Sequence, residues 1–401
     1  MNLNFGNTFL ATLLVGGTCV GGGILALPVE TGGIGFWPAI FVMLICWAFM
    51  TLTGLLYAEA SLWMKEEGAH VVTISKHLLG RWGEIISIIL YLFMGYASLV
   101  AYNAGGSLLI VNFVEAISSY GMEKWQAAIV FAFIFGSVLY LGTKLLGWIN
   151  SLFVMGMVVA YLGMVSIGIG GVKSELLERF NWGDLYFVLP LMITSFSFQM
   201  IVPSLAIYLE HNAKALKKSI LFGTMIPAVA YGVWLYVVLG IVPNEGAHGL
   251  EEALALGNPA TDSLRYFTHS KLLTGFAEYF AFFAIITSYL GISLGLYDFL
   301  SDLTGIKKKG VGKFTLGLLV FLPTLYFTVI YPSAFLFALD ITGGLGDSIL
   351  NGIIPVLMVW IGRYVIGYKE GEFRLFGGKA LLSLILFSAL LVIAAQIAKF
   401  I

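Results

Sequence analysis

The sequence predicts an all-α polytopic membrane protein, and its composition carries that prediction. Of the 401 residues, 59% are hydrophobic and only 11% are charged, and the mean hydropathy is +0.95. A soluble domain carries about 25% charged residues, so this composition is typical of a chain that crosses a membrane many times. The net charge of −1 and the lack of a basic tail predict no nucleic-acid partner.

Apolar segments long enough to cross a bilayer, which takes about 20 helical residues, recur along the whole chain. We therefore predict eleven transmembrane helices in one domain covering residues 1–401. When the N-terminus is placed in the cytoplasm, inner loops and span ends hold 15 Lys and Arg residues and outer ones hold 6, which places the C-terminus outside. The segments are 7–28, 34–63, 84–112, 125–142, 146–170, 184–208, 219–242, 272–300, 313–331, 334–360 and 379–400.

The first span contains a glycine cluster at residues 16–23, with five glycines in eight positions. Each glycine costs a helix roughly 1 kcal/mol relative to alanine. In hydrocarbon, an opened backbone is tolerated only where it is buried in protein or lines a cavity. The cluster thus indicates a helix broken to present free N–H and C=O groups to a ligand. Close helix packing through the spacing of Gly17 and Gly21 is the alternative on this stretch alone.

A second interruption lies in the sixth span, where TSFSFQMIVPS covers residues 194–204. Pro203 removes a backbone hydrogen bond, although a single proline in a span more commonly marks a packing kink. Breaks in the first and sixth spans are what two five-helix repeats of opposite topology would produce. We predict inverted repeats over about 7–170 and 184–360, with 379–400 as an additional helix.

Four stretches in order along the chain carry a family resemblance: GTCVGGGILALP at 17–28 with GIGF at 33–36, TSFSF at 194–198 with VPS at 202–204, TSYLG at 287–291 with GLYDFLSDL at 295–303, and FLP at 321–323 with YP at 331–332. They resemble the bacterial aromatic amino acid permeases of the amino acid/polyamine/organocation superfamily, the tyrosine-specific members above all. The resemblance implies the leucine-transporter fold with broken helices 1 and 6, in the bacterial inner membrane. It also implies import of an aromatic amino acid, first of all tyrosine, by cation symport and alternating access. Tryptophan and small neutral or hydroxylated amino acids, such as serine or threonine, are the alternative substrates.

The zwitterion of an amino acid needs donors for its carboxylate and acceptors for its ammonium group. N–H groups at the start of a half-helix suit the carboxylate, and carbonyls freed by the second break suit the ammonium. Aromatic residues beside that break would border the substrate side chain. Tyr102 and Asn103 of the third span would close the pocket, unless they form a buried and satisfied polar pair. The predicted substrate-binding residues are Thr18, Cys19, Gly21, Gly22, Gly23, Tyr102, Asn103, Ser195, Phe196, Ser197, Phe198 and Gln199.

A cation site is predicted in the eighth span, where the spacing of Ala284, Thr287 and Ser288 resembles sodium sites of leucine-transporter-type symporters. With carbonyls near Gly16 and Cys19, the hydroxyls of Thr287 and Ser288 would give the oxygen ligands that sodium prefers. The alternative is that both hydroxyls bond back to their own helix.

The coupling ion is a proton or sodium. The fifth span lacks the Lys that some proton-coupled relatives carry there, and Met157 falls at about that position. Intramembrane carboxylates are expensive and are therefore candidate proton carriers. The carboxylates considered are Glu59, Glu278, Asp298, Asp302 and Asp340.

Other classes of function find little support. The five histidines lie in or beside loops and HExxH does not occur, so we expect no enzyme activity and no cofactor. A channel is the other membrane class, but two broken helices in corresponding repeat positions favour a carrier. The expected partners are the amino acid and membrane lipid, with no obligatory protein partner.

Overall fold

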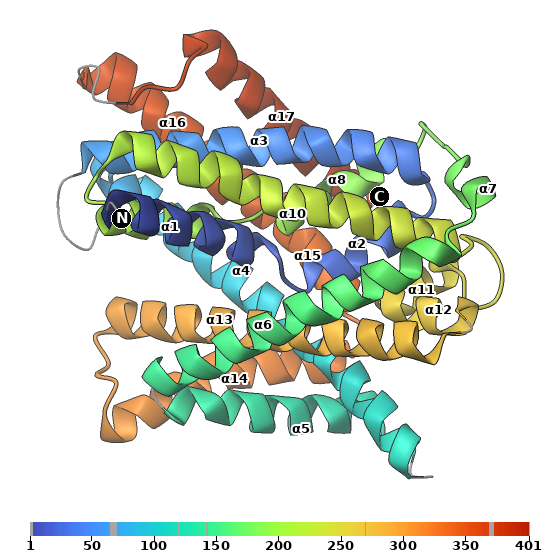
Figure 1. Cartoon of the computed structure of the whole chain (residues 1–401). Helices are drawn as coiled ribbons and strands as arrows, with labels where there is room; N and C mark the ends of the chain where they lie inside the picture. Colours follow the sequence, from blue (N-terminus) through green and yellow to red (C-terminus); the bar gives the residue numbers. More distant parts are fainter. Residues whose placement is uncertain are drawn as a thin grey trace.

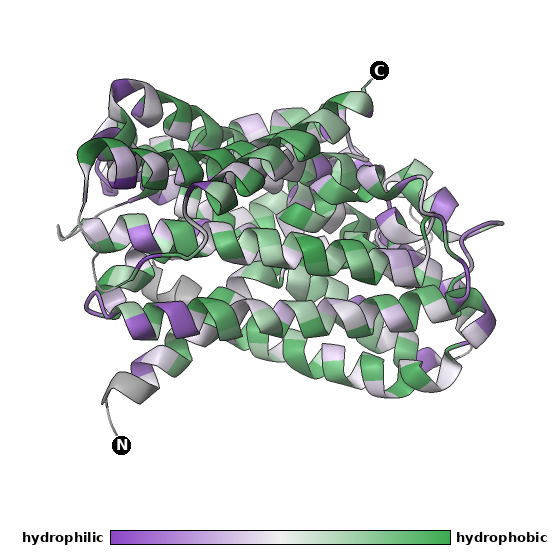
Figure 2. Ribbon diagram, turned by 90° about the horizontal axis from the view of Figure 1, so that it is seen from above, coloured by the Kyte–Doolittle hydropathy of each residue, from purple (hydrophilic) through white to green (hydrophobic). Residues whose placement is uncertain are grey.

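The computed structural model describes residues 3–64, 70–118, 121–141, 143–268, 270–368 and 373–400, and within these ranges it contains helices and turns but no strand. The helices form a bundle, with α7, α11 and α12 gathered at one end (Figure 1). Hydrophobic residues cover the helices along their length, whereas hydrophilic residues gather mostly at the two ends (Figure 2). This distribution is that of a membrane-spanning bundle, so the prediction of an all-α polytopic membrane protein is confirmed.

Among the described residues, nine helices are long and apolar enough to cross a membrane, and a tenth span results when the bent pair α1 and α2 is counted as one. A shorter apolar helix, α5, follows the third span. The helices that make up the apolar segments are α1 (Leu3–Cys19), α2 (Gly23–Thr31), α3 (Phe36–Trp63), α4 (Val71–Ile117), α5 (Lys124–Ser137), α6 (Thr143–Gly168), α8 (Leu185–Ser195), α9 (Val202–Tyr208), α10 (Ala213–Ile241), α13 (Lys271–Thr304), α14 (Gly310–Ile330), α15 (Phe335–Ile341), α16 (Ile354–Ile361) and α17 (Gly378–Ala398). The short elements are α7 (Ser174–Leu177), α11 (Leu250–Leu256), α12 (Ala260–Phe267), the 3₁₀ turns η1 (Val138–Leu141), η2 (Ile169–Gly171) and η3 (Gln199–Ile201), and the π-helices η4 (Thr342–Ile353) and η5 (Gly362–Ile366).

Two segments differ from their sequence-based boundaries. The third span was expected to begin at residue 84, but α4 begins at Val71 and bends at Gly80, whose φ of +70° lies in the left-handed region. The tenth span was expected as one ordinary helix, but its middle is the π-helix η4. π-Helical turns are rare and occur frequently at functional sites.

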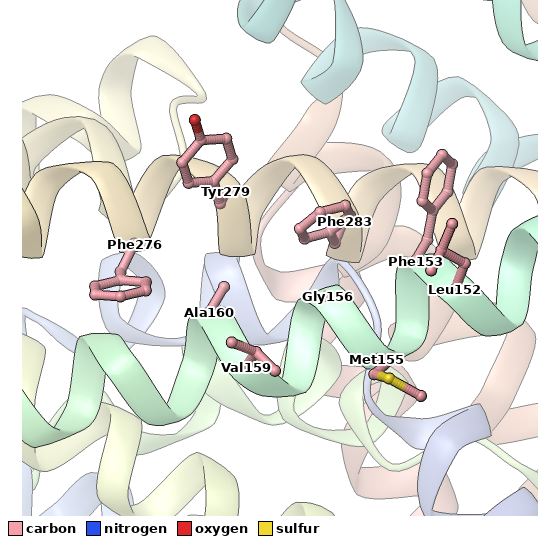
Figure 3. Close-up of a pocket in the computed structure, with 9 residues that line it drawn as sticks. All are labelled: Leu152, Phe153, Met155, Gly156, Val159, Ala160, Phe276, Tyr279 and Phe283. Atoms are coloured by element: carbon pink, nitrogen blue, oxygen red, sulfur yellow. The ribbon is translucent and has the colours of Figure 1, made fainter.

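The longest helix contact away from the breaks pairs α6 with α13. Gly156 and Gly163 of α6, seven residues apart, face the rings of Phe283 and Phe276, and a Cβ at either glycine would come within 2.7 Å of a ring carbon. The same surfaces line a cavity of about 520 Å³ whose wall is almost entirely apolar (Figure 3). None of its lining residues belongs to the predicted site.

Candidate functional site at two broken helices

The first break separates α1 from α2, which are bent by 51° across it. The N–H of Gly22 donates a 3.2 Å hydrogen bond to Ser288 Oγ on α13. A Cβ at Gly22 would overlap the ring of Tyr102 on α4, and a Cβ at Gly23 would lie 3.1 Å from Ser195 Oγ on α8. The missing side chains therefore let α4, α8 and α13 approach the bare backbone of the break.

One residue of the glycine cluster serves helix packing, but it is Gly16 and not the pair of Gly17 and Gly21 that the alternative interpretation named. A Cβ at Gly16 would lie 3.0 Å from the carbonyl oxygen of Gly223, and α1 packs along α10. Gly17 has no atom within 4 Å of its ideal Cβ position, so it takes no part in this contact. Gly16 thus lets α1 pack closely against α10, whereas Gly22 and Gly23 let side chains of α4 and α8 approach the backbone of the break.

The second break separates α8 from α9 and contains a tight turn. The N–H of Phe196 donates to the carbonyl of Ile193 at 3.0 Å, and that of Ser197 donates to the carbonyl of Thr194 at 3.1 Å. The chain resumes as η3 and then as α9, with Pro203 in its first turn, where a missing N–H costs nothing. Pro203 therefore starts the second half-helix rather than kinking a continuous one.

The two breaks meet at one side chain of α10. The hydroxyl oxygen of Tyr231 lies 2.7 Å from the carbonyl oxygen of Cys19 and 2.7 Å from that of Ser195, at the ends of α1 and α8. A hydroxyl carries one hydrogen, so it can donate to only one of these carbonyls at a time. The other carbonyl is left with an unused acceptor that a second donor can take.

Aromatic residues of the second break are buried around this junction. Phe196 packs edge-on against Tyr231, with ring centroids 5.1 Å apart, and is fully buried. Phe198 is also buried and packs its ring over Gly54 of α3. Apolar surface therefore surrounds the polar groups of the breaks.

Two predicted substrate-binding residues lie elsewhere. The amide nitrogen of Gln199 donates to two groups of α3, the carbonyl of Met50 and Thr53 Oγ1, at 3.0 Å each. Its amide oxygen accepts from the N–H of Phe198. Thr18 is exposed and donates to the carbonyl of Leu14, one turn earlier. The residues that the structure brings together at the breaks are Cys19, Gly21, Gly22, Gly23, Tyr102, Ser195, Phe196 and Ser288.

Of the two alternatives considered for the adjacent pair on α4, the structure contradicts the buried and satisfied polar pair. Tyr102 lies over Gly22, and its hydroxyl interacts with that of Ser288. Asn103 is fully buried, and neither atom of its amide has a hydrogen-bond partner among the described residues. A buried amide without partners costs about 1–3 kcal/mol. The pair is therefore not a satisfied one, and Asn103 keeps both a donor and an acceptor.

The predicted cation residues of α13 bond back to their own helix. Thr287 Oγ1 donates to the carbonyl of Phe283 at 2.8 Å, and Ser288 Oγ donates to that of Ala284 at 2.8 Å. The carbonyl of Gly16 accepts from the N–H of Val20 at 3.1 Å. Among the described residues, no three His, Cys, Asp or Glu side chains are grouped as metal ligands would be. The hydroxyls thus adopt the alternative arrangement, while Ser288 also reaches the first break.

Most of the carboxylates considered as proton carriers are paired. Glu59 and Arg363 are both buried and join through two hydrogen bonds of 2.7 and 2.5 Å. Asp340 lies 2.6 Å and Glu30 lies 2.9 Å from the ammonium of Lys399. The remaining pairs are Asp298 with Lys308 at 2.7 Å and Glu278 with Arg265 at 4.0 Å. Asp302 lies near His70 at the end of α13.

One buried carboxylate was not foreseen. Asp347 of η4 is fully buried, and its Oδ1 accepts 2.6 Å hydrogen bonds from Ser197 Oγ and from Asn351 Nδ2. Its Oδ2 has no partner among the described residues, and neither does Oδ1 of Asn351. The sequence does contain a signal that could have pointed to Asp347. It is a third interruption, TGGLGDSILNG at 342–352, inside an otherwise apolar span.

Breaks that gather free backbone groups inside a membrane-spanning bundle are typical of secondary transporters. The chain belongs to the tryptophan/tyrosine permease family, whose model matches residues 6–396. It is 31% identical to the tyrosine-specific transport system 1 of Haemophilus influenzae over 95% of this chain and 94% of the relative. It is 30% identical to a tryptophan-specific transport protein of Shigella flexneri over 93% and 91%, and 29% identical to a low affinity tryptophan permease of Escherichia coli over 96% and 94%. The protein is therefore a multi-pass membrane permease and not an enzyme.

Proposed function

We propose that this protein is a secondary active transporter that imports an aromatic amino acid, tyrosine or tryptophan, by cation symport through alternating access. Tyrosine is the first expectation, because the sequence resembles the tyrosine-specific permeases. Relatives carrying either name match almost the whole chain, which supports the aromatic class. A small neutral or hydroxylated amino acid is the alternative substrate.

The proposed architecture has eleven spans in a bacterial inner membrane, with the N-terminus in the cytoplasm and the C-terminus outside. The helices give this number when three pairs of elements each count as one span. These pairs are α1 with α2 as the first span, α5 with η1 as the fourth, and α8 with α9 as the sixth. The breaks then fall at the first and sixth spans, the first members of two inverted repeats as in the leucine-transporter fold. The asymmetry of Lys and Arg between the loops supports the orientation.

The observation that carries the proposal is the junction at Tyr231. Two half-helices end at Cys19 and Ser195, and one hydroxyl serves both carbonyls. An ammonium group has three donors and can take the acceptor that the hydroxyl leaves unused. The N–H groups at the start of α2, from Gly21 to Gly23, would receive the carboxylate, aided by the helix dipole.

The aromatic side chain of the substrate would lie beside Phe196 and Tyr102, which border the breaks. Stacked or edge-on rings contribute about 0.5–1.5 kcal/mol beyond the burial of their area. The unpaired amide of Asn103 offers a donor and an acceptor to a phenol or an indole N–H. Lipid and the amino acid are the only partners that the proposal needs.

The test is uptake of radiolabelled tyrosine, tryptophan and serine into proteoliposomes that contain the purified protein. A proton gradient and a sodium gradient are imposed separately, because either ion could drive symport. We expect accumulation of tyrosine or tryptophan above that in protein-free vesicles. Uptake of serine without either aromatic amino acid would favour the alternative substrate class, and uptake of none would contradict the proposal.

A further inference from the structure

We propose that Asp347 is the group that binds and releases the coupling ion, that this ion is a proton, and that it binds at Oδ2. This inference rests on the proposed symport and adds the residue and the atom at which the ion binds. It starts from two unpaired oxygens, Oδ2 of Asp347 and Oδ1 of Asn351, both in fully buried residues of the π-helix η4.

A buried carboxylate without a cation is strongly disfavoured, since an unpaired charge in a nonpolar interior costs many kcal/mol. The hydroxyl of Ser197 and the amide of Asn351 stabilise Oδ1 but carry no positive charge. The buried Glu59, in contrast, has Arg363 as its partner. Asp347 therefore needs a proton or a metal ion to become neutral.

The groups that face Asp347 from neighbouring helices leave it without a charged partner. Thr194 and Ser197 approach it from the second broken helix, and Cys19 and Tyr102 are within electrostatic range. Tyr57 of α3 donates to the carbonyl of Leu350, and Gln396 of α17 faces Gly344. The charged residues of the adjacent elements, Asp340 with Lys399 and Glu59 with Arg363, are paired with each other.

The number of available oxygens favours a proton over sodium. Hard metal ions are held by about six or more oxygen ligands. Among the buried side chains of the described residues, two oxygens here are unpaired, while Oδ1 of Asp347 already accepts two hydrogen bonds. A proton needs one acceptor. On binding, the carboxylate becomes a neutral carboxylic acid, and the buried site then carries no net charge.

The position of Asp347 also explains how a proton would promote substrate binding. Ser197, which bonds to the carboxylate, lies within the second break, and Cys19 and Tyr102 lie at the first. The charged form of Asp347 would repel a substrate carboxylate at Gly21–Gly23, because like charges repel strongly where water is excluded. Protonation removes this repulsion, so proton and amino acid bind with positive coupling, as symport requires.

The first test compares Asp347→Asn with wild type and with Asp298→Asn in sodium-free proteoliposomes under a proton gradient. Asp298 is a matched control, since it is half exposed and paired with Lys308. Wild type and Asp298→Asn should accumulate the amino acid and alkalinise the medium. Asp347→Asn should exchange labelled for unlabelled substrate but fill the vesicles only to the outside concentration. Proton-driven accumulation by Asp347→Asn, or sodium-dependent uptake by wild type without proton movement, would overturn the inference.

A second measurement needs no transport and separates failure of this inference from failure of the proposed function. Infrared difference spectra between acidic and alkaline pH report the carbonyl stretch of a carboxylic acid that loses its proton. Wild type and Asp298→Asn should share one such band that arises from Asp347. We expect this band to be missing from the spectrum of Asp347→Asn. If Asp347→Asn does not fold, Ser197→Ala provides the comparison, because loss of a donor to Oδ1 should shift the pH at which the band disappears. A band unchanged in these variants would contradict the role of Asp347 even in a protein that transports no amino acid.

Discussion

The carbonyl oxygens of Cys19 and Ser195, 176 positions apart in the sequence, share a single hydroxyl as their hydrogen-bond partner. Each carbonyl ends the first half of a broken helix, and the hydroxyl belongs to Tyr231 on α10. The side chain of Tyr231 thus holds the two breaks at a fixed distance from each other. Four predictions follow from the contacts around this junction and around the buried ion pair.

Tyr231→Phe should keep the ring that packs against Phe196 but remove the shared donor. Leaving buried carbonyls without a partner costs about 1–3 kcal/mol, so the melting temperature in detergent should fall. Tyr161→Phe is the matched control, because its hydroxyl donates at 2.7 Å to the carbonyl of Ala230 on α10 rather than to a carbonyl of either break. We expect both variants to lose stability but only Tyr231→Phe to lose substrate uptake. Equal uptake by the two variants would argue against a role for the junction in transport.

Gly22→Ala should abolish uptake, because its Cβ would overlap the ring of Tyr102. Gly17→Ala is the control on the preceding helix, where the added methyl group meets no atom within 4 Å. Gly17→Ala should transport normally, since alanine also favours a helix by about 1 kcal/mol over glycine. Surface labelling of intact cells verifies that both variants reach the membrane. Normal uptake by Gly22→Ala would show that the first break tolerates a side chain.

Ser288→Ala and Thr287→Ala separate two neighbouring hydroxyls of α13. Ser288 accepts from the N–H of Gly22 at 3.2 Å, whereas Thr287 bonds only to carbonyls of its own helix, at 2.8 and 3.3 Å. Ser288→Ala should therefore raise the KM for substrate several-fold, in line with about 1 kcal/mol for one hydrogen bond. Thr287→Ala should stay near the wild-type KM. If Thr287→Ala instead made uptake depend more steeply on sodium, the hydroxyl would belong to an ion site.

Glu59→Gln should destabilise the fold by about 3–5 kcal/mol, because it leaves the buried guanidinium of Arg363 without a counter-charge. Thermal unfolding in detergent measures the loss. Glu84→Gln is the control, since its partner Lys76 is 62% exposed and ion pairs at the surface contribute about 0–1 kcal/mol. Similar melting temperatures for the two variants would mean that the buried pair contributes little.

Local sequence signals predicted both breaks because their causes are local. The glycines before Ile24 disfavour a helix whatever surrounds them, and Pro203 weakens a continuous helix because it has no N–H to donate. Asp347 could not be predicted in the same way. Its partner Ser197 lies 150 positions earlier, and its lack of a cation becomes visible only once the helices are packed.

The same limit applies to residues whose role depends on a distant backbone. Nothing in the apolar sequence around Tyr231 distinguishes it from other tyrosines of the spans, since its acceptors lie in α1 and α8. Gln199 was placed beside the substrate because it adjoins a break, but its amide is spent on Met50 and Thr53 of α3. Spacing along the chain showed where the backbone opens, and only the packing shows which side chains face the opening.

The end of α17 has a consequence for engineering the protein. Lys399 holds Glu30 and Asp340, two carboxylates from the ends of α2 and α15, at 2.9 and 2.6 Å. A truncation that removes this last helix would leave two acidic groups facing each other without the ammonium between them. The residue that follows α17 thus works as a clamp that joins the end of α2 to the end of α15. Affinity tags at the C-terminus therefore need a spacer after Lys399, and a version shortened before α17 would have to neutralise both acids.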